Sequence, residues 1–466
     1  MEEYEDPLNV RFHAQTTSCR DCGPKYTLYD NNRREVEGDP IKIFAKYIDD
    51  GSIGIMKSWG GMHLICNLYE IERFRKWYGR EAKPFAVMFR NIDVVKDYMD
   101  VTEAEEREIS STRRPIVLVT KKKEKLDVLD GISPGLGNAG VYIPYTGLHH
   151  IFFKYLREDA VIMTSANIPG EPMIITDEDA FSLNADFCLL HNRDIINRID
   201  DTVIRLYNDR RFFLRRSRGF VPDKISINHD KTVIGVGAEE NVNSAISIGG
   251  NVYITQYIGN TKYYPTTEFL RSATEHLLGL LGARKVEGIG ADLHPRYLTK
   301  RYGRELAERF GVEIIEVQHH FAHAASLMVD NQVEEDIIAL TLDGAGYGTD
   351  GSIWGGEILL SSFEDFKRIG HLEKIPLIGG DAATKDPRRL VFAIFERLGR
   401  ETDLFEEGEA EILRNLMKRS PLTSSTGRVL DALSCYLGIG IKRSYDGEPA
   451  MRLEKYLDAG ELRYDF

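Results

Sequence analysis

Hydrophobic and polar positions in residues 41–222 follow two alternating patterns. The amphipathic run Ile41–Asp50 has the 3.6-residue period of a surface helix, and Gly51 stands where that helix would end. Short apolar runs such as Pro115–Thr120 and Ala160–Met163 are typical of buried strands. Because helices and buried strands alternate, this region is predicted to have an α/β or α+β fold.

The region after Thr232 repeats one order of elements: a strand, a glycine-containing loop, a strand, a Gly-Gly turn and a strand. The copies span Thr232–Gln256, with the turn at Gly249-Gly250, and Ile337–Leu360, with the loop Asp343–Gly351 and the turn Gly355-Gly356. A repeat of this kind predicts a duplicated fold with one phosphate loop from each half. Since the chain stops at Phe466 before the second half closes, we expect this domain to be incomplete at its C-terminus.

A candidate metal site lies at the centre of the second region. The strand-like run Val312–Val317 is followed by His319 and His323, which project from one face if a helix begins there. The apolar run Ile337–Leu342 then leads into Asp343, a candidate third ligand. Each feature alone has a plain alternative, namely surface or core histidines and an ordinary turn. Their occurrence in this order favours a metal site beside a phosphate loop.

Cationic and small polar residues stand at several predicted strand ends of the first region. They are Lys57, Lys83, Arg114, Thr164, Ser165 and Asn167. If these side chains converge on one cleft, they suit a nucleoside triphosphate or another polyanion. The alternative is that they are solvated surface residues, as lysine and arginine usually are.

Composition narrows the class of protein. A chain of 466 residues predicts two or three domains, and a net charge of −13 argues against general nucleic-acid binding. No apolar run approaches the length of a membrane span, and the five cysteines are too few for a disulfide framework. We therefore expect a cytoplasmic protein. Cys19 and Cys22 form a CxxC knuckle, which is half of a tetrahedral zinc site or, alternatively, a pair of idle thiols.

Ten motifs, in order along nearly the whole chain, resemble those of the HypF carbamoyltransferases of nickel–iron hydrogenase maturation. The motifs are RFHAQTTSCRDCGP, KPFAVMFRN, RRPIVLV, VYIPYTGLHH, TSANIPGEP, RRSRGFVP, VQHHFAHAAS, LDGAGYGTDG, GGDAA and YDGEPA. The resemblance implies a zinc-finger remnant in residues 1–40 and a YrdC-like α/β domain in residues 41–228, which forms a carbamoyl-adenylate. It implies an actin/hsp70-type duplicated ATPase domain, TsaD-like, in residues 229–466, which passes the carbamoyl group to the C-terminal cysteine thiol of HypE.

The resemblance also assigns site residues. Catalytic roles fall on Lys57, Lys83 and Arg114, and nucleotide binding on Ser165, Asn167, Ser217, Arg218, Gly344, Gly346, Gly348, Gly380 and Asp381. Metal ligation falls on His319, His323, Asp343, Cys19 and Cys22. The implied cofactors are ATP, Mg, Zn or Fe at the histidine site, and Zn at the cysteine knuckle if partner cysteines are supplied.

The chain departs from the family at both ends. The acylphosphatase-like region, the other zinc-finger cysteines and a C-terminal segment with a further Asp ligand are not found, so a fragment, a split gene product or a shortened variant is expected. The expected substrate is carbamoyl phosphate or carbamate, with no membrane involved and nucleic acid disfavoured as a partner. The alternatives are a related carbamoyl or threonylcarbamoyl transferase acting on tRNA or a small metabolite, and a truncated, non-catalytic assembly module.

Overall fold

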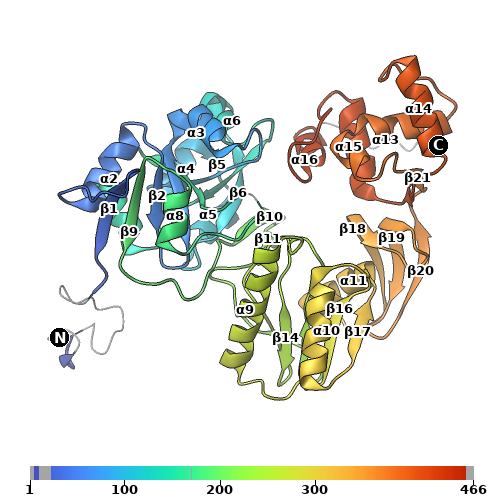
Figure 1. Ribbon diagram of the computed structural model, residues 1–466, viewed down its shortest axis with the longest axis horizontal. Helices are drawn as coiled ribbons and strands as arrows, with labels where there is room; N and C mark the ends of the chain where they lie inside the picture. The colour runs from blue at the N-terminus through green and yellow to red at the C-terminus, as the bar shows by residue number, and fades with distance from the viewer. Residues whose placement is uncertain (1–4, 10–22, 169, 458–466) are drawn as a thin grey trace.

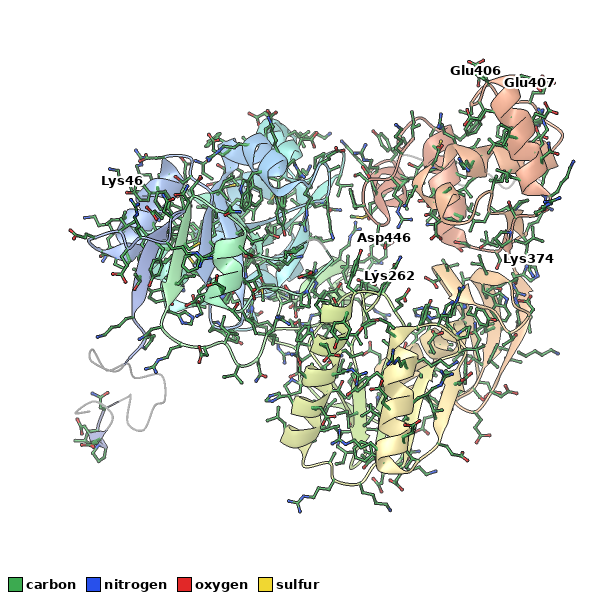
Figure 2. All side chains as sticks on the ribbon, in the orientation of Figure 1. Lys46, Lys262, Lys374, Glu406, Glu407 and Asp446 are labelled. Atoms are coloured by element: carbon green, nitrogen blue, oxygen red, sulfur yellow. The ribbon has the colours of Figure 1, made fainter. Side chains whose placement is uncertain are left out.

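A computed structural model describes residues 5–9, 23–168 and 170–457 of the chain (Figure 1). We divide it into a first unit (residues 26–215), a second unit (225–330) and a third unit (337–457). No helix among the described residues is both long and apolar enough to cross a membrane. Figure 2 shows charged side chains, among them Lys46, Lys374 and Glu407, at the periphery of the ribbon.

The first unit is one mixed, eleven-stranded sheet with helices on both faces. The strand order is β1-β9-β2-β3-β8-β4-β7-β6-β10-β11, and β5 pairs with β6. The strands are β1 (Tyr26–Asp30), β2 (Gly54–Lys57), β3 (Met62–Asn67), β4 (Ala86–Phe89), β5 (Met99–Asp100), β6 (Ile116–Lys121), β7 (Asn138–Tyr142), β8 (Ala160–Ser165), β9 (Phe187–His191), β10 (Val203–Tyr207) and β11 (Arg210–Arg215). The helices are α2 (Pro40–Asp49), α3 (Ile71–Tyr78), α4 (Ile92–Tyr98), α5 (Glu103–Ser110), α6 (Leu126–Ile132), α7 (Gly147–Tyr155) and α8 (Asp177–Ser182).

Burial on both faces explains why the central strands of this unit are mostly apolar, whereas β11 at the edge of the sheet is exposed. In β3, Leu64 belongs to the core under α3 and α6, and its neighbour Ile65 belongs to the core under α2 and α7. Helix α2 begins where expected, because the Asp39 carboxylate accepts hydrogen bonds from the backbone N–H groups of Ile41 and Lys42. The α/β prediction for this region is confirmed.

The second unit is a six-stranded sheet in the order β12-β15-β14-β13-β16-β17. Its strands are β12 (Ile225–Ser226), β13 (Val233–Gly235), β14 (Ala245–Ile248), β15 (Asn251–Ile254), β16 (Gly288–Asp292) and β17 (Ile314–Val317). Its helices are α9 (Tyr264–Leu281), α10 (Leu298–Phe310) and α11 (His319–Asp330). The histidine pair therefore opens a helix directly after a strand, as predicted.

The third unit joins a small sheet to a group of helices. The sheet has the order β18-β19-β22-β21, with β20 beside β19. The strands are β18 (Ile337–Tyr347), β19 (Ile353–Ser361), β20 (Phe366–His371), β21 (Ile375–Pro376) and β22 (Leu422–Thr423). The helices are α12 (Asp381–Lys385), α13 (Arg388–Arg397), α14 (Glu407–Met417), α15 (Thr426–Tyr436) and α16 (Glu448–Glu454). An ion pair between Glu454 of α16 and Arg205 of β10 ties these helices to the first unit.

The predicted duplication is confirmed, and so is the turn at Gly249-Gly250, which joins β14 to β15. Strands β13, β14 and β15 form an antiparallel meander, and so do β18, β19 and β20. The predicted loop Asp343–Gly351 is wrong up to Tyr347, because β18 continues through Gly344 and Gly346 with an irregularity in its pairing, and only residues 348–352 form the loop. The predicted turn at Gly355-Gly356 is also wrong, because both glycines lie inside β19. Inside β18 and β19 the glycines mark close packing, not chain reversal.

Candidate functional site

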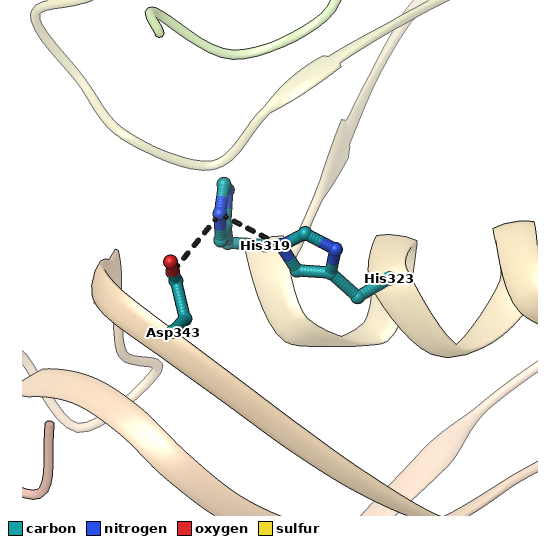
Figure 3. A group of neighbouring side chains, drawn as sticks. All are labelled: His319, His323 and Asp343. Carbon is teal, nitrogen blue, oxygen red and sulfur yellow. Dashed lines mark hydrogen bonds and ion pairs between the residues drawn. The ribbon is translucent and has the colours of Figure 1, made fainter. Parts of the chain in front are cut away.

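Three side chains of the predicted metal site converge (Figure 3). The Nε2 atoms of His319 and His323 lie 3.2 Å apart, and His319 Nε2 lies 3.2 Å from Asp343 Oδ2. All three ligand atoms lie within 4.8 Å of one another. Two ligands of a tetrahedral zinc ion, each about 2.0–2.1 Å from the metal, are roughly 3.3 Å apart, so this donor set fits such an ion. Two ring nitrogens that face each other also need a proton or a cation between them.

Asp292, at the end of β16, is a member of this site to which the sequence analysis gave no role. Its Oδ2 lies 2.7 Å from His319 Nδ1, the ring nitrogen that faces away from His323. Burial alone would lower the pKa of His319, but hydrogen bonds to Asp292 and Asp343 outweigh it and raise that pKa to about 9. Carboxylates placed behind a ligand histidine commonly fix its tautomer and ring orientation. Asp292 therefore orients His319 toward the other two ligand atoms.

Close packing of β18 against helix α11 explains why Gly346, one of the predicted phosphate-loop residues, has no side chain. A Cβ atom on Gly346 would lie 2.4 Å from a ring carbon of His320, whereas a Cβ atom on Gly344 would meet open space. His320 is fully buried against β18, and burial lowers its pKa to about 4. The Ser425 hydroxyl, at the start of α15, donates to the Gly344 carbonyl at 2.6 Å. Neighbouring elements thus hold the Asp343 segment on both sides.

A second candidate site is a cavity of about 340 Å³ at the carboxyl end of β8. Its lining includes the predicted residues Lys83, Ser165 and Asn167, together with Arg80 and Arg215, which the sequence analysis did not single out. Part of Lys83 is open to solvent, yet burial of its ammonium group, followed by the charges of Arg80 and Arg215, lowers its pKa to about 8. Three cations around one cavity suit a polyanionic ligand.

Two further groups shape this cleft. Arg75 of α3 donates hydrogen bonds to the backbone carbonyls of Arg80 and Lys83, at 3.1 and 3.0 Å, and so fixes the loop that carries both cations. Asp201 is buried between Arg218 and His63; burial would raise its pKa, but these two neighbours hold it well below its usual range. Because the carboxylate of Asp201 neutralises Arg218, that arginine is less available to a ligand than predicted.

Other predicted residues lie outside the cavity. Lys57 is buried and bonds to Asp177 at 2.6 Å, because the end of β2 faces helix α8 instead of the cleft. Arg114 has a left-handed backbone (φ 47°), and its guanidinium donates to the Ile109 carbonyl at 3.3 Å. The structure therefore does not bring Lys57 and Arg114 to the cavity that Lys83 lines, since side-chain direction at a strand end depends on register.

The remaining predicted residues are placed as follows. Ser217 is fully buried, and its backbone N–H donates to Thr202. Gly348 forms the turn between β18 and β19 and packs against Trp354. Gly380 and Asp381 form the start of α12, where their backbone groups bond to the local turn. Cys19 and Cys22 lie outside the described residues.

Four family models match the chain. A HypF finger model matches residues 1–29, and a Sua5, YciO and YrdC model, described as telomere recombination, matches residues 46–217. The HypF Kae1-like domain matches residues 228–330, and the carbamoyltransferase Kae1-like domain, second subdomain, matches residues 339–466.

Curated relatives cover nearly the whole chain. It is 44% identical to a probable carbamoyltransferase HypF of Methanocaldococcus jannaschii over 92% of this chain and 58% of the relative. It is 34% identical to the carbamoyltransferase HypF of Rhizobium leguminosarum bv. viciae over 98% of this chain and 67% of the relative. The chain therefore spans roughly three fifths to two thirds of the length of these relatives.

Two solved structures share this fold. The crystal structure of T. kodakarensis HypF superposes with a TM-score of 0.93 and 40% identity over 99% of this chain and 64% of that one. A full-length HypF in the phosphate- and nucleotide-bound form gives 0.89 and 33% identity over 97% of this chain and 61% of that one.

The fold and the two sites define a mixed α/β protein in which a YrdC/Sua5-like part precedes a duplicated Kae1-like part. Within that class, the chain belongs to the HypF carbamoyltransferase family.

Proposed function

We propose that this chain transfers a carbamoyl group, at the expense of ATP, through a carbamoyl-adenylate to the C-terminal cysteine thiol of the carrier protein HypE. Residues 41–228 form the adenylate and residues 229–466 carry out the transfer. The observation that supports this assignment is that this chain, which belongs to the HypF family, has two separate sites, one suited to an anion and one suited to a cation. One is the cation-lined cavity with Lys83, and the other is the cluster of His319, His323 and Asp343.

The first step makes a poor acyl donor reactive. A carbamate oxygen attacks the α-phosphorus of ATP, a P–O bond forms, the bond to the β-phosphate oxygen breaks, and pyrophosphate leaves with its Mg. Lys83, Arg80 and Arg215 surround the cavity in which this negative charge develops. Fixed cations in a site that excludes much of the water stabilise such charge better than water does.

The second step exchanges oxygen for sulfur at the carbamoyl carbon. The HypE thiolate attacks this carbon, a C–S bond forms, the C–O bond to AMP breaks, and AMP leaves with the bonding electrons. His319, His323 and Asp343 would hold a Zn or Fe cation beside this reaction, with Asp292 keeping His319 aligned. Such a cation, when bound, polarises a carbonyl or phosphoryl oxygen.

The product places the chain in nickel–iron hydrogenase maturation. The S-carbamoyl group becomes a thiocyanate and then the cyanide ligand of the active-site iron. Carbamate derives from carbamoyl phosphate, and the reactions take place in the cytoplasm. Cys19 and Cys22 supply half of a zinc site, which is complete if partner cysteines are supplied from outside residues 1–40. The HypF finger model over residues 1–29 supports this last assignment.

Mass spectrometry of HypE tests the proposal. Incubated with the chain, ATP and ammonium bicarbonate, which contains carbamate at equilibrium, HypE should gain the mass of one carbamoyl group. A HypE variant with serine in place of the terminal cysteine should gain none. Replacing both His319 and His323 with alanine should abolish this transfer and leave pyrophosphate exchange intact, whereas unchanged transfer would refute the role of the histidine site.

A further inference from the structure

A continuous line of side-chain contacts joins the cleft of the first unit to the second unit. The Ser165 hydroxyl donates to Asp200 Oδ1 at 2.6 Å, and Arg215 Nη1 lies 3.5 Å from the same oxygen. The Arg215 guanidinium carbon lies 4.4 Å from the centroid of the Tyr257 ring, and the Tyr257 hydroxyl donates to Asn241 Oδ1 at 3.0 Å. Four contacts therefore connect Ser165 with Asn241.

The two ends of this line belong to the two candidate sites. Ser165, Asp200, Arg215 and Tyr257 all line the cleft cavity, although Tyr257 follows β15 of the second unit. Asn241 lies in the loop 236–243 between β13 and β14. Gly237 and Ala238 of that loop line a cavity of about 300 Å³ together with His319 and His323. The loop that receives the Tyr257 hydroxyl thus borders the histidine site.

The residues between the ends can respond to a ligand. Arg215 is held by the Asp200 carboxylate on one side and by the Tyr257 ring on the other. A phosphate in the cleft would compete with Asp200 for the guanidinium and, by drawing Arg215 away, would change its contact with the ring. Burial raises the pKa of Tyr257, which keeps the hydroxyl neutral and able to donate. Asn241 has φ 53°, a region that asparagine tolerates better than most residues.

We infer that Tyr257 is a positioning residue that the second unit supplies to the adenylation cleft, and that it couples occupancy of the cleft to the loop 236–243 beside the histidine site. This inference rests on the proposed function in so far as the cleft binds ATP. Binding of a ligand in the cleft then makes the loop 236–243, beside the proposed transfer site, more rigid.

The test compares variants of the full chain. Tyr257→Phe keeps the ring on Arg215 and removes the bonds that the hydroxyl makes with Asn241 and Arg215, whereas Tyr257→Leu removes the ring contact as well. Asn241→Gly removes the acceptor and tolerates the positive φ. Tyr253→Phe, a half-buried tyrosine of β15, is the matched control. Lys83→Met weakens binding in the cleft, and so it distinguishes protection caused by a ligand in the cleft from protection caused by a ligand bound directly to the loop.

Hydrogen exchange of residues 236–243 is measured with and without α,β-methylene-ATP, and calorimetry gives its dissociation constant. In the wild type and in Tyr253→Phe, the analogue should slow exchange of the loop at least fivefold, a typical allosteric coupling. In Tyr257→Phe and Asn241→Gly this protection should disappear with the dissociation constant changed less than threefold. In Tyr257→Leu binding should also weaken about tenfold. The double variant Tyr257→Phe/Asn241→Gly should match the single variants.

Three outcomes would overturn the inference. Protection that persists in Tyr257→Phe would remove the role of the hydroxyl. Protection that persists in Lys83→Met, at an analogue concentration that saturates the wild-type cleft but not the cleft of this variant, would show direct binding to the loop. Analogue binding without any protection in the wild type would show that the sites are uncoupled while leaving the proposed function intact. Failure of the folded wild type to bind the analogue would instead overturn the proposed function and this inference with it.

Discussion

The cleft of the first unit and the histidine site of the second present charge of opposite sign. In the cleft, Arg80, Lys83 and Arg215 face a cavity that three acids also line. Asp201 is held by Arg218 and Asp200 lies against Arg215, and the third acid is Glu171. At the histidine site, the carboxylates of Asp292 and Asp343 flank neutral or singly protonated rings. The cleft is therefore suited to a polyanion and the histidine site to a cation. This contrast supports a division between activating carbamate and transferring it.

The largest expected effect is loss of the bound cation when the histidine ligands are replaced. Replacing His319 and His323 with alanine removes two of three ligands and should lower the bound metal by one ion per chain, as measured by elemental analysis of the purified protein. His150→Ala, at an exposed histidine of α7, should keep the metal content of the wild type. An unchanged metal content in the double variant would mean that the cation binds elsewhere.

On the anion side, Lys83→Met should weaken ATP binding about 10- to 100-fold, because one charge-assisted hydrogen bond is lost. Lys57→Met provides the comparison, since Lys57 faces Asp177 and not the cleft. It should leave the dissociation constant within about twofold and chiefly lower the melting temperature. Isothermal titration calorimetry measures both variants, and equal losses of affinity would place Lys57 in the binding site after all.

The orientation of His319 by Asp292 should make a smaller contribution to metal affinity. Asp292→Asn removes the charge behind the His319 ring and should weaken metal affinity about 10-fold, the lower end of the usual range for such partners. Competition with a chelator of known affinity measures the change, and Asp336→Asn, an exposed acid before β18, is the control. Equal affinities for Asp292→Asn and the wild type would reduce Asp292 to a structural group.

Two glycines of β18 offer a matched pair. Gly346→Ala forces a Cβ against the His320 and His319 rings and should cost about 1–3 kcal/mol of stability and several-fold in metal affinity. Gly344→Ala meets open space and should change both by much less. Urea denaturation and the chelator assay compare them, and a larger effect at Gly344 would favour the phosphate-loop role given to it from the sequence.

The smallest effect is a pH dependence of the cleft. Since the pKa of Lys83 is lowered to about 8, its ammonium is charged at pH 7 and loses its proton as the pH rises through 8. ATP affinity should therefore fall between pH 7 and pH 9, by about threefold to tenfold, and this fall should be absent in Lys83→Met. A wild-type affinity that is constant over this range would assign the main phosphate contacts to the arginines.

The two sites also differ in how far they could be predicted from the sequence. His319 and His323 share one helical turn, and Asp343 follows one strand later, so local periodicity was enough to bring them together. The residues that line the cleft come from β4, β8 and β11 and from a loop of the second unit. The order of the strands in the sheet brings them together, and local sequence patterns do not predict that order. The sequence therefore could not show that Lys83, Ser165 and Asn167 line the cavity while Lys57 and Arg114 do not.

Other features of the site have no local pattern. Asp292 ends a short strand more than twenty residues before His319, and only the parallel pairing of β16 with β17 brings the two together. The glycines of β18 and β19 were predicted to lie in loops and turns because a strand rarely contains so many glycines. They lie in strands because rings and backbone from α11 and α15 approach where Gly346 and Gly355 have no side chain.

The most direct test of the account is ATP–pyrophosphate exchange by the purified chain supplied with ammonium bicarbonate. The account predicts exchange that depends on carbamate, is lost in Lys83→Met and is retained when His319 and His323 are both replaced with alanine. A folded chain that binds ATP but shows no carbamate-dependent exchange would contradict the assignment of adenylate formation to the first unit.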